Sequence, residues 1–130
     1  MLRSPEPAPL HRHRLLDRFG IVLSGLCMVH CLAGLVLIGV LGLGGGLLLN
    51  PAIHHVGLAL AVTIGALTIG ANALRFGHRL PLALGVCGLL LMTAAILSDH
   101  GVGESILTIG GVALLASAHV VNLRRAPVCC

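Results

Sequence analysis

The sequence predicts an all-α integral membrane protein that folds as a bundle of four transmembrane helices. Of its 130 residues, 57% are hydrophobic and only 9% are charged, whereas soluble domains carry about 25% charged residues. Four apolar stretches follow one another, and each approaches the roughly 20 residues that a helix needs to cross a bilayer. We expect one transmembrane domain over residues 17–125, with spans at about 18–43, 54–74, 80–97 and 105–123.

The two ends of the chain differ from this apolar core. Residues 1–16 contain three of the six prolines and three arginines, so we expect a cytoplasmic, disordered arm. The apolar run from Phe19 to about Leu49 is too long for the roughly 7–15 apolar residues of a signal peptide, so we expect it to be retained. Residues 126–130 are expected to form a short cytoplasmic tail that ends in two cysteines.

Glycine, proline and charged residues mark the limits of the spans. Glycines 44–46 and Asn50-Pro51 are expected to end the first span as helix breakers. Pro81 falls in the first turn of the third span, where a missing N–H costs little. Arg124-Arg125 is expected to stop the fourth span. Only short connections remain between the first and second spans and between the third and fourth, which predicts two helical hairpins.

The arginines predict the orientation. In a four-span arrangement they all fall on the side of the two termini, and the other two loops contain none. The positive-inside rule then places both termini in the cytoplasm. The formal charge of +4 does not indicate nucleic-acid binding, because the arginines are scattered at the ends of the spans and no soluble fold presents them. The arginines are Arg3, Arg12, Arg14, Arg18, Arg75, Arg79, Arg124 and Arg125.

The first span contains a candidate metal site, Cys27-x-x-His30-Cys31. Spacings of three and four residues place the three side chains on one face of a helix. Thiols and imidazole are preferred donors for soft or borderline metal ions. Cys27 lies nine residues beyond Arg18, roughly 14 Å into the span and near its middle. The alternative is that the two cysteines are small apolar residues that fill the core.

Other ionisable side chains fall at the ends of the spans. His54 and His55 are expected at the outer mouth, either as metal ligands or as ordinary interfacial residues. His119 is expected at the inner end of the fourth span, at the depth of Asp17, which could be its partner. Ionisable residues within a membrane are candidates for function. We therefore include all four among the candidate metal ligands.

The remaining cysteines lie outside the first-span motif. Cys87 is alone in the third span, and we expect it to fill the core. Cys129 and Cys130 form a vicinal dithiol in the tail, where an exposed pair is reactive. The complete set of candidate metal ligands is Cys27, His30, Cys31, His119, Cys129, Cys130, Asp17, His54 and His55.

This set of donors predicts a carrier rather than an enzyme. A thiolate pair can hold a soft cation and release it to another thiol that attacks it, so thiols in sequence could pass an ion across the membrane. The chain has no G-x-x-x-x-G-K-[ST] motif for nucleotide binding. Transport would therefore run downhill, driven by capture inside the cell.

The motifs resemble those of the MerC-type mercury-resistance membrane proteins. The similar residues are Asp17-Arg18-x-Gly20, Ser24-Gly25-x-Cys27-x-x-His30-Cys31, Ala118-His119-x-x-Asn122 and a tail with cysteines. The resemblance implies uptake of Hg(II) through the inner membrane, with no permanently bound cofactor. Cys27 and Cys31 would receive the ion, and Cys129 and Cys130 would accept it. Implied partners are membrane lipid, a periplasmic metal donor and a cytoplasmic thiol acceptor or mercuric reductase.

Three alternatives stay open at this point. The imidazole of His30 would also suit Zn(II) or Cu(I). The protein could instead be a membrane thiol sensor or assembly partner, although Cys27 and Cys31, one helical turn apart, would form a strained disulfide. In a purely structural subunit the cysteines would be incidental.

Overall fold

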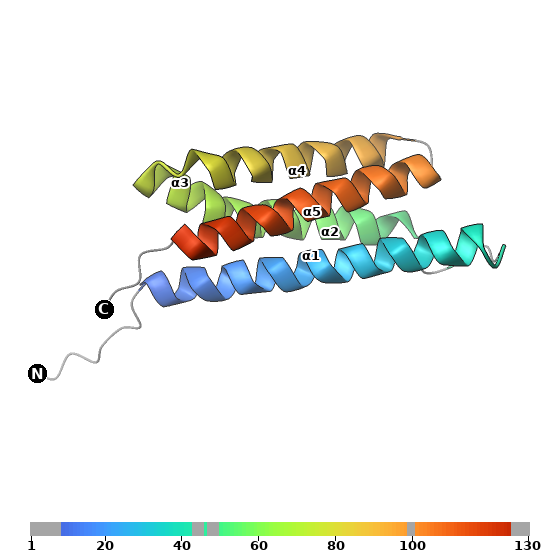
Figure 1. The fold of residues 1–130 in the computed structure, drawn as a ribbon, viewed down its shortest axis with the longest axis horizontal. Helices are drawn as coiled ribbons and strands as arrows, with labels where there is room; N and C mark the ends of the chain where they lie inside the picture. Colours follow the sequence, from blue (N-terminus) through green and yellow to red (C-terminus); the bar gives the residue numbers. More distant parts are fainter. Residues whose placement is uncertain (1–8, 43–45, 47–49, 99–100, 126–130) are drawn as a thin grey trace, which may run out of the picture.

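The structure, a computed structural model, describes residues 9–42, 46, 50–98 and 101–125, with side chains from residue 12 onward. In this part of the chain it is all-α and has no strand. The helices lie side by side in an elongated bundle, and the start of α1 and the end of α5 lie at the same end of it (Figure 1). The helices are α1 (Pro9–Gly39), α2 (Pro51–Gly65), α3 (Ala71–Phe76), α4 (Arg79–Leu97) and α5 (Val102–Arg125); a π-helical segment, η2 (Ala66–Gly70), joins α2 to α3.

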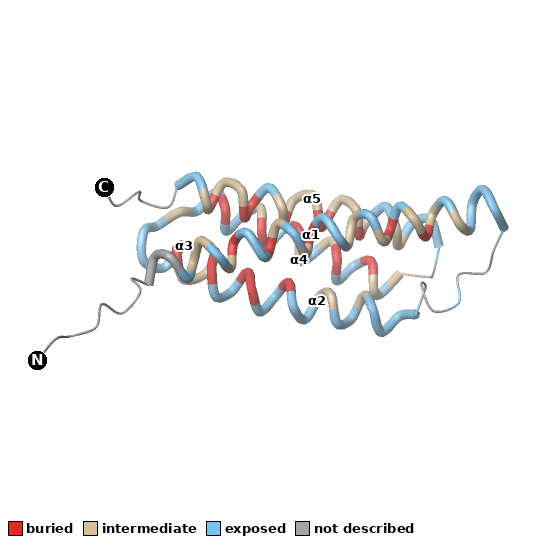
Figure 2. The backbone as a smooth tube through the Cα atoms, turned by 90° about the horizontal axis from the view of Figure 1, so that it is seen from below, coloured by how far each residue is buried: buried red, intermediate tan, exposed pale blue. Residues whose placement is uncertain are grey.

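The outer surface of the bundle is apolar. Along α1, the outward side chains of Phe19, Val22, Leu26 and Val29 are all more than half exposed. Figure 2 shows buried residues on the inward sides of the helices and exposed residues around them. Lipid is the solvent that such a surface requires. The protein is therefore a multi-pass membrane protein, and in the described residues the helices able to span are Arg12–Gly39, Pro51–Phe76, Arg79–Leu97 and Val102–Arg125.

The first helix begins earlier than expected. Residues 1–16 were expected to be disordered, but α1 starts at Pro9 and runs without interruption into the first span. Proline is well suited to the first helical position because its missing N–H needs no partner there. No glycine or proline follows until Gly20, so the helix can extend backwards from the span. Residues 1–8 and the tail 126–130 lie outside the described part.

Asn50 and Pro51 start a helix rather than end one. The side-chain oxygen of Asn50 accepts a hydrogen bond from the backbone N–H of Ala52 at 3.0 Å, and Pro51 occupies the first turn of α2. This is a typical N-cap followed by an N1 proline. α1 ends at Gly39, four residues before the expected limit, and Gly42 then takes a left-handed conformation with φ of +61°.

The second span contains a feature that the sequence did not indicate. It was expected as one helix over 54–74, but α2, η2 and α3 together cover residues 51–76 and include five π-helical residues. Gly77 ends α3 with φ of +66°, and its N–H bonds the carbonyl of Ala73 at 2.9 Å. π-helical segments are rare and often lie near functional sites.

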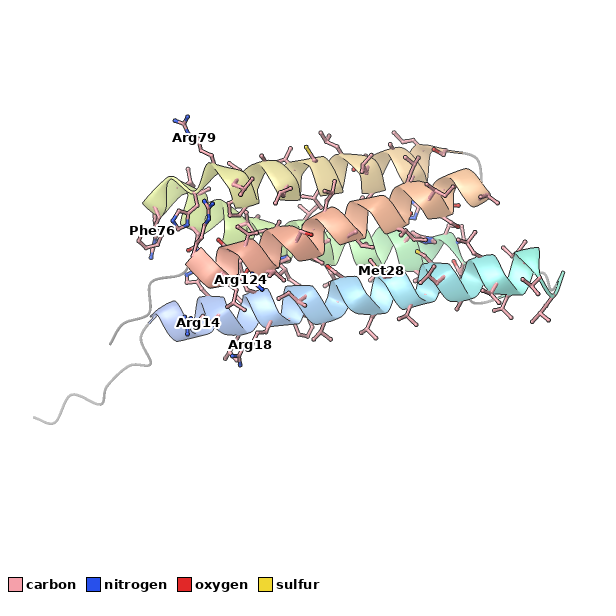
Figure 3. All side chains as sticks on the ribbon, viewed as in Figure 1. Arg14, Arg18, Met28, Phe76, Arg79 and Arg124 are labelled. Atoms are coloured by element: carbon pink, nitrogen blue, oxygen red, sulfur yellow. The ribbon has the colours of Figure 1, made fainter. Side chains whose placement is uncertain are left out.

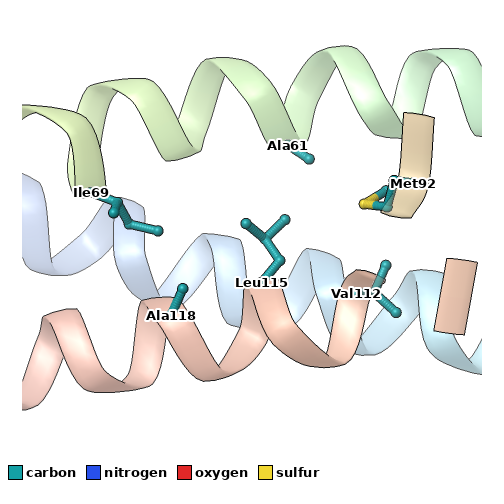
Figure 4. Close-up of a cluster of buried hydrophobic side chains, with 6 residues drawn as sticks. All are labelled: Ala61, Ile69, Met92, Val112, Leu115 and Ala118. Atoms are coloured by element: carbon teal, nitrogen blue, oxygen red, sulfur yellow. The ribbon is translucent and has the colours of Figure 1, made fainter. Parts of the chain in front are cut away.

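Small residues bring α4 and α5 together, and these two helices make the most extensive contact in the bundle. A Cβ atom on Gly88 would lie 2.7 Å from the carbonyl oxygen of Gly111, and one on Gly111 would lie 2.8 Å from that of Gly88. Such close approach is typical of helices packed in lipid. The core beside this contact consists of Ala61, Ile69, Met92, Val112, Leu115 and Ala118 (Figure 4).

Candidate metal centre

The end of the candidate site that lies away from the start of α1, called the outer end from here on, joins three helices; the opposite end of the bundle is called the inner end. The Sγ atom of Cys31 on α1 lies 3.9 Å from Nε2 of His54 on α2. The other ring nitrogen of His54, Nδ1, lies 3.5 Å from Oε1 of Glu104 in the first turn of α5. A carboxylate behind the imidazole is the usual support of a metal-binding histidine. The geometry is therefore that of a thiol and a supported imidazole facing one another.

Cavities lie on both sides of His54. One, of about 270 Å³, is lined by Cys27, His30, Cys31 and His54 among others. The second, of about 310 Å³, is lined by His54 and Glu104 together with residues at the ends of α1 and α5. His54 contributes to both walls, so it separates the first-span cysteines from the mouth of the bundle. The ring of His30 meets that of His54 edge-on, with centroids 5.9 Å apart.

Cys27 lines the cavity of about 270 Å³ and also a much smaller one, called the inner cavity. Its sulfur faces α2, where a Cβ atom on Gly57 would be 3.8 Å from Sγ. The inner cavity has a volume of about 10 Å³, and Gly20, Ser24, Cys27 and His119 contribute to its lining. The space between the helices is therefore much smaller on the side of Cys27 toward His119 than on the side toward Cys31.

The inner end contains a buried polar network. Nδ1–H of His119 donates to Oδ1 of Asp17 at 2.9 Å, and the amide of Asn122 donates to Oδ2 of Asp17 at 2.8 Å. Asn72 on α3 donates to the side-chain oxygen of Asn122 at 3.2 Å. Asp17 and His119 are each only 1% exposed. The expected contact between Asp17 and His119 is present, and the network ties α1, α3 and α5 together.

The ring of His119 fits only because residue 20 is glycine. A Cβ atom at Gly20 would lie 2.6 Å from Nε2 of His119 and 2.7 Å from its Cε1. With Nδ1 held by Asp17, the opposite edge of the ring, which contains Nε2, packs against Gly20 on α1. His119 also contributes to the lining of the inner cavity.

His55, one of the candidate ligands, and Cys87, the expected core residue, both lie away from the cavities. His55 is exposed, and its Nδ1–H donates to the carbonyl oxygen of Pro51 in the same helix at 2.8 Å. Cys87 is exposed on α4, so the expectation that it fills the core is wrong. Cys129 and Cys130 lie outside the described residues. The other candidates, Cys27, His30, Cys31, His54, Asp17 and His119, line the cavities or the inner network.

Glu104 and Ser24 were not among the candidates from the sequence. Glu104 falls just before the fourth span expected at 105–123, but α5 starts at Val102 and carries Glu104 toward His54. Ser24 is buried in the lining of the inner cavity. Within the described residues, no three His, Cys, Asp or Glu side chains form a group that could hold a metal ion. The donors lie one after another along the bundle and do not make a closed centre.

Comparison with known proteins gives one match. The family model described as MerC mercury resistance protein matches residues 17–124. No match was found among curated proteins or among solved structures. The matched range begins at Asp17 and includes the outer donors, Cys27, the narrow cavity and the inner network.

Proposed function

The chain belongs to the MerC mercury resistance protein family, and we propose that it carries Hg(II) inward across the cell inner membrane. One observation supports this most directly. Cys27 and Cys31 line the same half-open cavity of about 270 Å³, in a bundle whose outer surface is apolar. Two thiols in a cavity within a membrane are suited to a soft cation. Polar groups at that depth are costly without such a role.

The order of the donors gives the proposed route. The ion enters the cavity of about 310 Å³ beside Glu104 and passes His54 to reach Cys31. It then moves to Cys27, four residues earlier on the same face of α1 and about 6 Å along the helix. Each step is an exchange of ligands in which an incoming donor attacks the bound ion before the previous one leaves.

The open arrangement of donors supports transport over storage. A closed site with three or four ligands would bind the ion tightly and shield it from attack. In the described residues the donors do not gather in this way. An ion held by one or two ligands stays accessible to the next thiol. Release to Cys129 and Cys130, or to a mercuric reductase, would complete the transfer.

The arginines support the inward direction. All seven arginines that the structure describes lie at the end of the bundle where α1 begins and α5 ends, and Figure 3 labels four of them, Arg14, Arg18, Arg79 and Arg124. The positive-inside rule assigns this end to the cytoplasm. The wide cavities lie at the opposite end, so they would face the periplasm and a metal donor there.

The test is uptake of Hg(II) into vesicles that contain the purified chain and an internal thiol. We expect Cys27→Ser and Cys31→Ser each to reduce the initial rate by more than about tenfold. Cys87→Ser is the matched control, because Cys87 is exposed on α4 away from the path, and it should leave the rate unchanged. Uptake at the full rate by the Cys27→Ser/Cys31→Ser double variant would disprove the proposal.

Zn(II) or Cu(I) is a second candidate cargo. His30 and His54 add two imidazoles to the cavity that contains the cysteines, and mixed nitrogen and sulfur donors suit both ions. Competition between Hg(II), Zn(II) and Cu(I) for the purified protein distinguishes the candidates. Retention of Hg(II) against an excess of each competitor is the result expected for a mercury carrier.

A further inference from the structure

The narrow cavity on the inner side of Cys27 has unusual walls for its size. Its volume of about 10 Å³ is near the lower limit for one water molecule or ion. Most of its lining is apolar, but Ser24, Cys27 and His119 also contribute to it. Gly20, Ser24 and Cys27 follow one another on one face of α1, at spacings of four and three residues. A chamber for a single particle therefore continues the path inward from Cys27.

Two polar groups in this wall lack partners. Nε2 of His119 and the hydroxyl of Ser24 make no hydrogen bond within the described part of the chain, although both residues are at least 97% buried. Asp17 meanwhile fixes the other ring nitrogen at 2.9 Å. This combination, one nitrogen held by a carboxylate and the other open, is the usual preparation of a metal-binding histidine.

We propose that this cavity is an inner station for the transported cation, with Nε2 of His119 as its principal ligand. The inference rests on the proposed carrier function and adds a site to it. Cys27 and His119 both contribute to the wall of this cavity, so the ion can pass within it from the sulfur of Cys27 to Nε2 of His119. The cation is of the soft or borderline class that accepts both sulfur and imidazole nitrogen.

The transfer is a ligand exchange. The bond from the Cys27 sulfur to the metal breaks, a bond from Nε2 of His119 forms, the thiolate keeps its electron pair, and the metal keeps its oxidation state. A soft ion binds one imidazole less tightly than a thiolate. The inner station therefore holds the ion weakly, where a thiol on the arginine side can remove it. Without this station, Cys27 would have to release the ion across the narrow part of the bundle in one step.

The experiment compares two replacements of His119 that differ in chemistry. His119→Cys supplies a soft donor but loses the hydrogen bond to Asp17, whereas His119→Gln can keep that bond but supplies no soft donor. Each full-length variant is reconstituted in vesicles and loaded with one equivalent of Hg(II). Transfer to an internal thiol is then followed over a single turnover. His55→Gln is the matched control, since His55 is exposed and bonded to its own helix.

A ligand role predicts that His119→Cys transfers faster than His119→Gln. We expect His119→Gln to slow transfer by about tenfold or more, while Hg(II) binding to Cys27 and Cys31 and the His55→Gln rate stay unchanged. A structural role predicts the opposite order, because glutamine preserves the bond to Asp17. Equal rates for the two variants, or a faster His119→Gln, would overturn the proposal.

A second measurement does not depend on how the His119 variants fold. In a chain with Cys87, Cys129 and Cys130 replaced by serine, ¹⁵N spectra of the histidine side chains are recorded as Hg(II) is added. The Nε2 resonance of His119 should shift at the second equivalent, and an unchanged resonance would refute the inner station. If the proposed carrier function itself were wrong, uptake of Hg(II) would not depend on Cys27 and Cys31. If only the inner station were wrong, that dependence would remain.

Discussion

At position 20, the absence of a side chain determines where His119 can lie. A methyl group there would approach three atoms of the imidazole ring at 2.6–2.8 Å, closer than packed atoms tolerate. We expect Gly20→Ala to displace the ring from Asp17 and to lower the free energy of unfolding by about 1–3 kcal/mol, the usual cost of overpacking. The measurement is denaturant unfolding of the purified protein in micelles, followed by circular dichroism.

Gly25→Ala is the control for this substitution on the same helix. Nothing lies within 4 Å of a Cβ atom at Gly25, and alanine favours helix over glycine by up to about 1 kcal/mol. This variant should therefore be as stable as the wild type or slightly more stable. Equal stability of the two variants would mean that His119 does not depend on the space at Gly20.

At the same scale, the sequence predicted the pairing of Asp17 with His119 but not the choice between His54 and His55. Counting residues along two spans is enough to place Asp17 and His119 at one depth. Adjacent helical residues point about 100° apart, so only one of the two histidines can face the path. Which one does so depends on how α2 is rotated, and that rotation is set by Gly57 and Ala61 packing against the other helices.

Among the elements, the contact between α4 and α5 depends most closely on small residues. A Cβ atom on Gly88 would meet the backbone of α5 at 2.7 Å and 3.1 Å, and backbone atoms cannot move aside singly. We expect Gly88→Ala to separate the two helices and to cost about 1–3 kcal/mol. Unfolding of the variant in the same micelles measures this loss.

Gly110 provides the comparison for Gly88. It is next to Gly111 on α5, but a Cβ atom there would meet only a side-chain carbon of Leu91 at 3.7 Å, an ordinary contact. Gly110→Ala should therefore leave stability within about 0.5 kcal/mol of the wild type. If Gly110→Ala were as damaging as Gly88→Ala, glycine in α5 would matter for another reason than close approach.

The spans were predictable from the sequence, whereas the irregularity within the second one was not. Composition and length reveal an apolar helix but contain no signal for a π-helical turn. The extra residue in η2 rotates the helix beyond it by about 100°. Asn72 follows η2 directly and reaches Asn122 at 3.2 Å. The π-helical segment thus orients Asn72 toward a partner 50 residues later in the chain. A pattern of neighbouring residues cannot reveal such a partner.

For the molecule as a whole, the two ends of the long axis differ in charge and in the size of the cavities between the helices. The start of α1, the end of α5 and the described arginines lie at one end, and the two cavities of about 270 Å³ and 310 Å³ extend toward the other (Figures 1 and 3). The sequence predicted the grouping of charge because it follows from an even number of spans. It could not predict the cavities, because they depend on gaps between side chains of different helices.

Because the two ends differ, the direction of transport depends on which end of the bundle faces the cytoplasm. We predict that a cysteine at Phe76 is reached only from the cytoplasm and one at Val102 only from the periplasm. Both positions are exposed, and they lie near opposite ends of the bundle. Phe76 is preferable to Gly77, because the positive φ of Gly77 would strain any side chain. The positive-inside rule supplies the expected sign.

The measurement uses an impermeant maleimide on intact cells and on inverted vesicles, with the five native cysteines replaced by serine. Cells should label only Val102→Cys, and inverted vesicles only Phe76→Cys. The reverse pattern would place the wide cavities and Cys31 on the cytoplasmic side and the narrow chamber at His119 on the periplasmic side. The same donors would then receive metal from inside the cell, and the chain would be an exporter.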